Sequence, residues 1–431
     1  MSNGTELTPE QLLTEFFQGN EFDLWVKDEL SSVYCGTGFI NRKPVAAYCL
    51  QADQIKGAIG PQEANEIIEL SEFARAKKMP LVSINAVLFP RMTAGITGIE
   101  ACERIIRMSG RVSEDLPHIA ILTEEAAQNH GFLSTYADVI IVQDPSSKNE
   151  GSDIGQIVES SLSDLMTRAR ALVTLIPSTR TELKESLTFS YDGGDRELSK
   201  DVLEALKRPG PYDVNLLIEN IVDQSSFIEF DKSRGPAVVT GIGKLVNQTV
   251  GICASQTMTA APIDDEALKK ITEITRFCER FSLPLINLVD TTDETTQQTL
   301  LAGKALRTVG NFSMSVRHGS EVFAARQTMS PCVSLVVRRC YGSGYLLTTS
   351  MRPHHVILAL KNANFSRYDN ELTAERAHAD GWIKKVIPPS QIIEQLVHWV
   401  RWSRSKRARV TDQLHRNDPM RYNLNLDNSN E

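Results

Sequence analysis

Two short stretches of the sequence combine side chains that could take part in chemistry. In the first, Glu124 and Glu125 are followed closely by Gln128, Asn129 and His130. A carboxylate at this place could act as a general base. Acidic residues are also favoured in the first turn of a helix by the helix dipole alone, so a solvated helix start stays open as the alternative.

The second stretch runs from Tyr341 to Tyr345, contains two glycines and follows Arg338 and Arg339. Glycine is favoured where the backbone must approach a ligand closely. The same glycines would also suit a turn that enters a buried helix. Leu346, which comes directly afterwards, fits either an apolar substrate chain or the inner face of such a helix.

Metal and disulfide chemistry are not expected. The seven cysteines are scattered without a C-x-x-C pair, which excludes a disulfide framework and a thiolate zinc site of the usual spacing. Most of them should be small buried hydrophobic residues. His354 and His355 are too close in sequence for a two-ligand helical site, and no carboxylate lies at metal-ligand spacing. We therefore expect no metal centre. We expect the isolated His118, His130 and His318 to be packing or surface residues rather than catalysts, although His130 belongs to the first stretch.

An internal repeat would position both stretches. Residues 36–49 and 241–253 each predict a β-hairpin, with two strands around a polar tip. In both halves a helix and a buried strand should follow, then a second helix, a second buried strand and a third helix. The predicted segments are 66–76, 80–85, 98–108, 117–123, 124–136 and an extra strand at 137–142 in the first half, and 268–280, 284–290, 309–326, 331–337 and 338–350 in the second.

This alternation predicts an α/β protein with two homologous domains in tandem, each built on a mixed or parallel sheet covered by helices. Turn-forming residues from Arg208 to Tyr212 place the boundary between the two domains. The expected organisation is an N-terminal arm (1–20), a first domain (21–193), a linker (194–234), a second domain (235–410) and a flexible tail (411–431).

Composition and charge limit the classes of partner. The chain of 431 residues has 46 basic and 54 acidic side chains and a net charge of −8, which argues against nucleic acid or an anionic membrane. Its longest apolar runs are far shorter than the ~18–20 residues of a membrane span. Residues 1–20 lack the basic start and apolar stretch of a signal peptide. We expect a cytoplasmic protein.

The order of these motifs resembles the carboxyltransferase (β) subunit of acyl-CoA carboxylases, of the propionyl-CoA carboxylase type. The likeness covers about residues 10–400, and its motifs recur at near-family spacing in both halves. They are 36–51 with 80–85, 241–256 with 284–290, the segment 338–345, and the stretches 162–178, 211–221 and 370–382. The resemblance implies two crotonase-like (ββα-spiral) domains and a biotin-dependent transfer of CO2 to the α-carbon of an acyl-CoA thioester.

In that family two oxyanion holes face each other across a subunit interface. By resemblance, the amides of Ser343 and Gly344, beside Gly342, would hold the thioester enolate, and Leu346 would sense the acyl chain. Backbone N–H groups at a helix N-terminus can stabilise a developing oxyanion with little reorganisation. Ser343 replaces a glycine of the family pattern but keeps the amide that the hole needs.

The other hole, which would hold the ureido oxygen of biotin, departs from the family. The Ala-Gly-Gly-Ala pattern becomes Ala127, Gln128, Asn129 and His130 here. By resemblance, the amides of Gln128 and Asn129 would be the donors and His130 would lie in the same wall. Glu124 would repel a carboxylated cofactor and could supply a general base instead.

Other family signatures survive only in part. Arg91, which the resemblance places at the substrate, and Gly95 are retained, but Leu88 and Phe89 stand where the family has two glycines. The usual proline–glycine loop after Asp290 is replaced by a polar segment, and the loops after the first hole and after residue 350 also differ. Standard carboxylase activity would need several of these features.

Three functions therefore remain open. The first is an acyl-CoA or acyl-carrier carboxyltransferase with altered biotin contacts, working within a ligase complex. The second is a biotin-independent decarboxylase or acyltransferase of the same fold, and the third is a noncatalytic subunit of a carboxylase complex. No tightly bound cofactor is expected; the CoA or carrier thioester would be the substrate. The partners implied are an acyl-CoA or acyl-carrier protein, a second copy or a related subunit, and a biotin carboxylase or carrier subunit.

Overall fold

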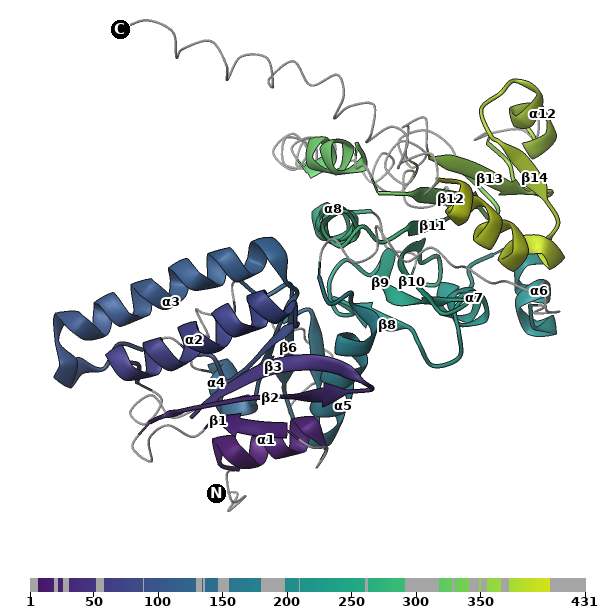
Figure 1. Cartoon of the computed structure of the whole chain (residues 1–431). Helices are drawn as coiled ribbons and strands as arrows, with labels where there is room; N and C mark the ends of the chain where they lie inside the picture. The colour runs from purple at the N-terminus through teal and green to yellow at the C-terminus, as the bar shows by residue number, and fades with distance from the viewer. Residues whose placement is uncertain are drawn as a thin grey trace, which may run out of the picture. The chain divides into compact units, whose positions relative to one another are not determined.

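The computed structural model divides the chain into two compact units. One comprises residues 1–187 with 228–234, and the other comprises 188–227 with 235–431. Figure 1 shows the elements of each unit. The structure describes residues 7–18, 22–25, 31–51, 58–87, 89–128, 134, 136–145, 155–179, 198–208, 210–259, 263–290, 318–327, 330–340, 349, 355–365 and 372–403.

The first unit is built on a sheet of strand order β1-β2-β3-β4-β5-β6-β7. The pairs β1–β2 and β2–β3 are antiparallel, and the pairs from β3 to β7 are parallel. Its elements are α1 (Pro9–Phe17), β1 (Phe22–Trp25), β2 (Val33–Ile40), β3 (Lys43–Leu50), α2 (Pro61–Lys77), β4 (Leu81–Ile84), the 3-10 turn η1 (Met92–Ala94), α3 (Ile96–Asp115), β5 (His118–Leu122), α4 (Glu124–Gln128), β6 (Val139–Gln143), β7 (Ile157–Glu159) and α5 (Leu162–Leu175).

The second sheet has the order β14-β13-β12-β11-β10-β9-β8. The hairpin β9–β10 is antiparallel, and the pairs from β10 to β14 are parallel. The elements of this half are α6 (Lys200–Lys207), α7 (Val214–Ile221), β8 (Ile228–Phe230), β9 (Val238–Leu245), β10 (Gln248–Ser255), α8 (Asp265–Arg280), β11 (Leu285–Val289), β12 (Cys332–Val336), β13 (Val356–Leu360), α12 (Ala374–Ala379), β14 (Lys385–Ile387) and the 3-10 turn η5 (Pro389–Gln391).

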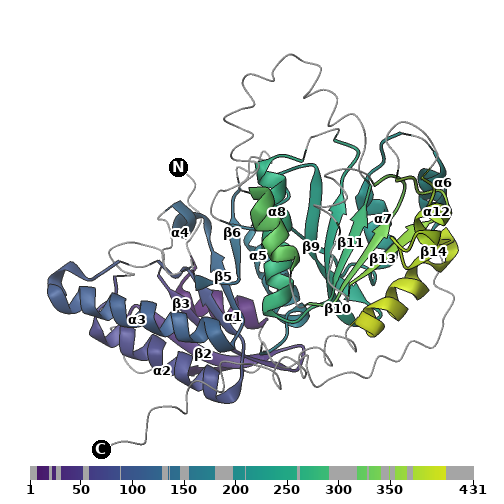
Figure 2. The same ribbon diagram turned by 90° about the horizontal axis from the view of Figure 1, so that it is seen from above.

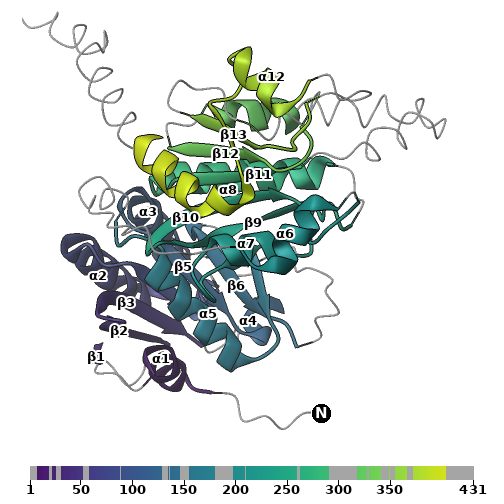
Figure 3. The ribbon, with the colours of Figure 1, turned by 90° about the vertical axis from the view of Figure 1, so that its right-hand side faces the viewer.

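Helices cover both faces of each sheet. In the first unit α2 and α3 lie over one face, and α1 and α5 lie against the other (Figures 1 and 3). In the second, α8 packs on one side of β9 and β10, and α7 packs on the opposite side (Figure 2). This arrangement confirms the predicted α/β class with two similar halves.

The two predicted hairpins are confirmed, and their tips have the same conformation. The tip residues Asn41 and Arg42 have positive φ, and so do Val246 and Asn247. Two successive left-handed residues match the twist of the flanking strands in a two-residue hairpin. The carboxylate of Asp223 accepts hydrogen bonds from the amides of Val246 (3.0 Å) and Asn247 (2.8 Å), which supports a conformation that valine rarely adopts.

The repeat extends to polar groups inside the core. In the first unit the Oγ of Ser83 and the Nε2 of His118 are 2.8 Å apart, and both side chains are buried. In the second, Asn287 donates to the Sγ of Cys332 at 3.0 Å and accepts from the guanidinium of Arg326 at 2.6 Å. Ser83 and Asn287 occupy the same register position, so each half places a hydrogen-bonded polar side chain at this point of the core.

Two predicted helices differ from the structure. The helix expected over 124–136 is described only as α4, which ends at Gln128. The helix expected to begin at Arg338 does not begin there, because residues 338–340 form a bridge and turn instead. The short strands β13 and β14 were not predicted.

All seven cysteines are buried and none forms a disulfide. None of the described helices combines the length and apolar character that crossing a membrane requires. The predicted tail, residues 411–431, lies outside the described residues.

Candidate active site

The carboxyl ends of β11 and β12 bring two charged residues together. Asp290 follows β11, and Arg338 comes two residues after the end of β12. Because neighbouring parallel strands end at the same edge of a sheet, the two side chains meet, and the Nε of Arg338 lies 2.6 Å from the Oδ2 of Asp290. The Asp290 side chain is only 2% exposed and that of Arg338 is 15% exposed, so this is a nearly buried ion pair.

The guanidinium of Arg338 also holds the chain between residues 208 and 212. Its Nη1 donates to the carbonyl of Arg208 at 3.1 Å and to that of Gly210 at 2.5 Å. It lies over the ring of Tyr212, 4.6 Å from the ring centroid, which is a favourable cation–π distance. The side chain of Arg338 therefore connects the carboxyl edge of the second sheet to the segment that contains Arg208, Gly210 and Tyr212.

Burial controls the titration of the neighbouring acids. It raises the pKa of the Asp290 carboxyl, while Arg338 and the backbone amide of Arg339 act in the opposite direction. Burial also raises the pKa of the Tyr212 phenol; the nearby Asp290 adds to the rise and Arg338 opposes it. The Tyr212 hydroxyl has no hydrogen-bond partner within the described part of the chain.

The main chain that leaves β12 is held on both flanks. The amide of Val337 donates to the carbonyl of Val289 at 2.8 Å, on the β11 side. On the other side, the amide of Asn364 donates to the carbonyl of Arg338 at 2.7 Å, and the amide of Cys340 donates to the carbonyl of Asn364 at 3.0 Å. These bonds replace the helical start that the sequence predicted. The candidate residues Gly342, Ser343, Gly344 and Leu346 lie outside the described residues.

The equivalent edge of the first unit is held by neutral groups. The Oδ1 of Asn85, just after β4, accepts hydrogen bonds from the amide (2.9 Å) and the hydroxyl (3.0 Å) of Thr123, just after β5. The carbonyl of Thr123 accepts from the amide of Ala127 at 2.9 Å, which opens α4. Ala126 anchors α4 in a small apolar cluster whose other buried members are Val87, Leu122 and Val142.

The first turn of α4 carries two acidic side chains. Glu124 is exposed and Glu125 is partly buried. Neither carboxylate forms an ion pair with a basic side chain of the described residues. The side chain of Gln128, and the whole of Asn129 and His130, lie outside what the structure describes. The two edges therefore differ in charge, because the register places Glu124 where the second unit has Arg338.

Arg91 has a partner within its own unit. Its guanidinium pairs with the carboxylate of Glu63, which is 1% exposed, and donates to the carbonyl of Ala58 at 3.2 Å. The other oxygen of Glu63 accepts from the amide of Gly60 at 2.9 Å, at the start of α2. The Arg91 side chain is still 37% exposed. The structure therefore gives Arg91 a structural role in holding Glu63 and Ala58. Its contact with substrate stays a prediction.

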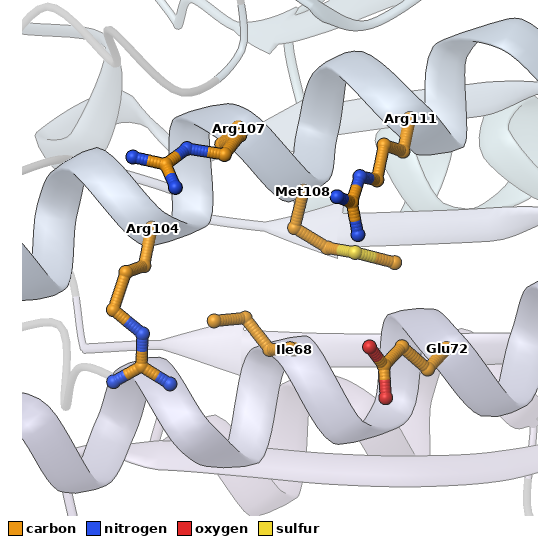
Figure 4. A pocket seen from close by; sticks show the side chains of 6 residues that line it. All are labelled: Ile68, Glu72, Arg104, Arg107, Met108 and Arg111. Atoms are coloured by element: carbon orange, nitrogen blue, oxygen red, sulfur yellow. The ribbon is translucent and has the colours of Figure 1, made fainter.

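A pocket of about 180 Å³ lies between α2 and α3 (Figure 4). Two of its arginines already have partners: Arg104 donates to Asn65 at 2.7 Å, and Arg107 pairs with Glu103 at 2.6 Å. Its lining residues are Ile68, Glu72, Arg104, Arg107, Met108 and Arg111. Nowhere in the described residues do three or more His, Cys, Asp or Glu side chains come together in a way that could hold a metal ion.

Comparison with known proteins decides the family. The model of the carboxyl transferase domain matches residues 14–148 and 156–375, which is most of the chain. This chain belongs to the carboxyl transferase domain family. The resemblance predicted from the motifs is thereby confirmed.

Relatives in the family are distant in sequence. The propionyl-CoA carboxylase beta chain of Rhodococcus erythropolis is 23% identical over 367 residues, and the match covers 78% of this chain and 74% of that protein. The corresponding chain of Saccharopolyspora erythraea is 22% identical over 353 residues, covering 73% of this chain and 62% of that protein.

Solved structures confirm the fold. A crystal structure of transcarboxylase 12S, described as a hexamer assembly with methylmalonyl-coenzyme A and methylmalonic acid bound, matches with a TM-score of 0.71 at 18% identity. The match covers 92% of this chain and 89% of that chain. A single-chain, multi-domain long-chain acyl-CoA carboxylase matches with a TM-score of 0.64 at 16% identity, over 91% of this chain and 46% of that chain.

The network of Asp290, Arg338 and Tyr212 was not predicted from the sequence. A signal for it was present, since an acidic residue follows one buried strand and a basic residue follows the next. Such residues meet whenever the two strands are parallel neighbours. The Tyr212 contact had no comparable signal, because it depends on where the linker packs.

Proposed function

We propose that this protein is a carboxyltransferase-family enzyme that stabilises the enolate of an acyl thioester, bound to CoA or to a carrier protein. The observation that carries this proposal is the ion pair of Arg338 with Asp290, which fixes the chain just before the predicted donor amides of Ser343 and Gly344. A hole for an oxyanion needs donors that are held in place before the charge develops.

The same hole would serve two directions of one reaction. Loss of CO2 from a carboxylated thioester leaves the bonding electron pair on the α-carbon, and the thioester oxygen takes up the negative charge as an enolate. Addition of CO2 to that enolate is the reverse. Backbone amides would stabilise the oxyanion in both directions, and one such donor is worth ~2.7–4 kcal/mol.

Two acidic side chains at the start of α4 support the proposal that the biotin site is altered. Glu124 and Glu125 have no basic partner in the described part of the chain, and carboxybiotin is itself negatively charged. Like charges at close range are repulsive, most strongly where water is excluded. We therefore infer an altered or lost biotin site and assign no step to biotin. Biotin-independent decarboxylation or acyl transfer is the reaction class that this edge favours, with Glu124 as candidate base and Gln128, Asn129 and His130 as the rebuilt wall.

Biotin-dependent carboxyl transfer is the second candidate, because the family match extends over both halves of the chain. In that case the amides of Gln128 and Asn129 would still hold biotin, and a carboxylase or carrier subunit would supply it. Either reaction would use a site composed from two chains. We therefore propose a homo-oligomer, or a hetero-oligomer with a related subunit.

The two candidates separate in one assay. The protein is incubated with methylmalonyl-CoA or malonyl-CoA, with and without free biotin, and CO2 is measured. We expect turnover without biotin that falls in Glu124→Gln but not in the control Glu114→Gln, an exposed carboxylate of α3. Turnover only with biotin would favour the second candidate. No turnover with any thioester would favour a noncatalytic subunit.

A further inference from the structure

Three arginines of α3 lie on the side of the helix that borders the pocket beside α2. Arg104, Arg107 and Arg111 are spaced three and four residues apart, so their side chains share one helical face. At a rise of ~1.5 Å per residue, the first and the last are about 10 Å apart along the helix. Together they line the pocket of about 180 Å³ with Ile68, Glu72 and Met108.

The positive charge of this row is available to a partner. Arg104 donates to the neutral amide oxygen of Asn65 at 2.7 Å, and Arg111 has no ion pair or hydrogen bond with the described residues. Arg107 pairs with Glu103, but both side chains are 65% exposed, and an ion pair this exposed contributes little stability. A carboxylate from another molecule could therefore replace Glu103 at small cost.

The two ends of the row are separated by apolar side chains. Figure 4 shows Arg104 and Arg107 at one end of the pocket and Arg111 at the other, with Met108 and Ile68 between them. Met108 is only 4% exposed, so it forms a fixed apolar floor. The pocket is smaller than the ~300–1,000 Å³ that encloses a whole small molecule, so a single side chain fills it better than a cofactor.

These features together fit a helix of a partner protein. On such a helix an apolar residue can insert between Met108 and Ile68, while acidic residues four positions before it and three positions after it lie on the same face. Those two acids are then about 10 Å apart, the same spacing as Arg104 and Arg111. A small anion would contact one end of the row only, and a uniformly charged chain would leave the apolar floor uncovered.

We propose that the surface of α2 and α3 around this pocket docks an acidic amphipathic helix of another protein. The carboxylates of that helix would pair with Arg104 and Arg111, and its apolar side chain would fill the pocket. Glu72, which lies at the Arg111 end (Figure 4), opposes a carboxylate there and limits the affinity. None of these residues has a role in the proposed reaction, so the inference does not rest on the proposed function.

The test uses an alanine-based helical peptide with one leucine between two glutamates at that spacing, labelled for fluorescence anisotropy. We expect the parent protein to bind it, and Arg111→Gln to weaken binding about fivefold. Glu72→Gln should strengthen binding by a similar factor. The control Arg75→Gln removes the same charge from the same pair of helices, but Arg75 pairs with Asp115 outside the pocket, at 2.5 Å, so binding should stay unchanged.

A second pair of measurements separates this surface from general attraction between charges. A peptide with serine in place of leucine should bind more weakly, because no apolar side chain then fills the pocket, and sodium diphosphate should compete poorly. No peptide binding at millimolar concentration, or equal losses in Arg111→Gln and Arg75→Gln, would overturn the proposal. Complete displacement of the peptide by an equal concentration of diphosphate would also overturn it, in favour of a site for small anions.

Discussion

Replacing Arg338 by methionine tests how the second sheet is closed at its carboxyl edge. Methionine has a similar length but no charge, so Asp290 would keep its place, 2% exposed, without its cation. Removing one partner of a buried ion pair costs about 3–5 kcal/mol, mostly because the other charge is left without compensation. For a unit of this size each kcal/mol lowers Tm by about 2–4 °C, so we expect a fall of roughly 6–20 °C.

The pH dependence of this loss has a definite sign. Burial already raises the pKa of Asp290, and removal of Arg338 would raise it further. The folded variant then binds a proton more tightly than the unfolded chain, so the variant loses stability as pH rises from the unfolded pKa through the folded one. The difference in Tm between Arg338→Met and the parent should therefore be largest at neutral pH and smaller at pH 5.

The double variant Asp290→Asn with Arg338→Met provides the control. It removes both charges, so it should recover most of the stability that Arg338→Met loses. Differential scanning calorimetry at neutral pH and at pH 5 measures the Tm of the parent, of Arg338→Met and of the double variant. The reasoning is refuted if Arg338→Met loses less than about 1 kcal/mol, or if the double variant is no more stable than the single one.

The remaining predictions concern the hole, the packing and the assembly. Gly344→Pro should lower kcat by the equivalent of ~2.7–4 kcal/mol once circular dichroism confirms folding, and unchanged turnover would refute the oxyanion assignment. Gly251→Ala should cost about 1–3 kcal/mol, because its Cβ would lie 2.1 Å from the Sγ of Cys278. Gly110→Ala, with nothing within 4 Å of its Cβ, should instead stabilise α3 by about 0.5–1 kcal/mol; equal denaturation midpoints would contradict this pair. Light scattering should show an oligomer at micromolar concentration, and a 48-kDa particle would exclude a site shared between chains.

The order of elements could be predicted because it depends on local signals. Alternating apolar residues and the polar tips at Asn41 and Asn247 determine the hairpins, and helical spacing determines α2 and α8. The repetition of this order in both halves is what made the family recognisable at a sequence identity near 23%.

The details at the carboxyl edges depend on contacts that local patterns do not contain. A helix was expected from Arg338 because glycines and apolar residues follow it, but the main chain there bonds to Asn364 instead. The side chain of Arg338 was not assigned a role, because Asp290 and Gly210 are far from it in sequence. Tertiary contacts of this kind override local preference at the ends of elements.

The most direct measurement of the central claim is CO2 release from methylmalonyl-CoA in D2O with no biotin present. An enolate formed by loss of CO2 takes its proton from solvent, so mass spectrometry should find propionyl-CoA with one deuterium on the α-carbon, formed faster than in a protein-free blank. We predict this product with the parent protein and far less of it with Gly344→Pro. Release of CO2 that begins only when biotin is added would contradict it.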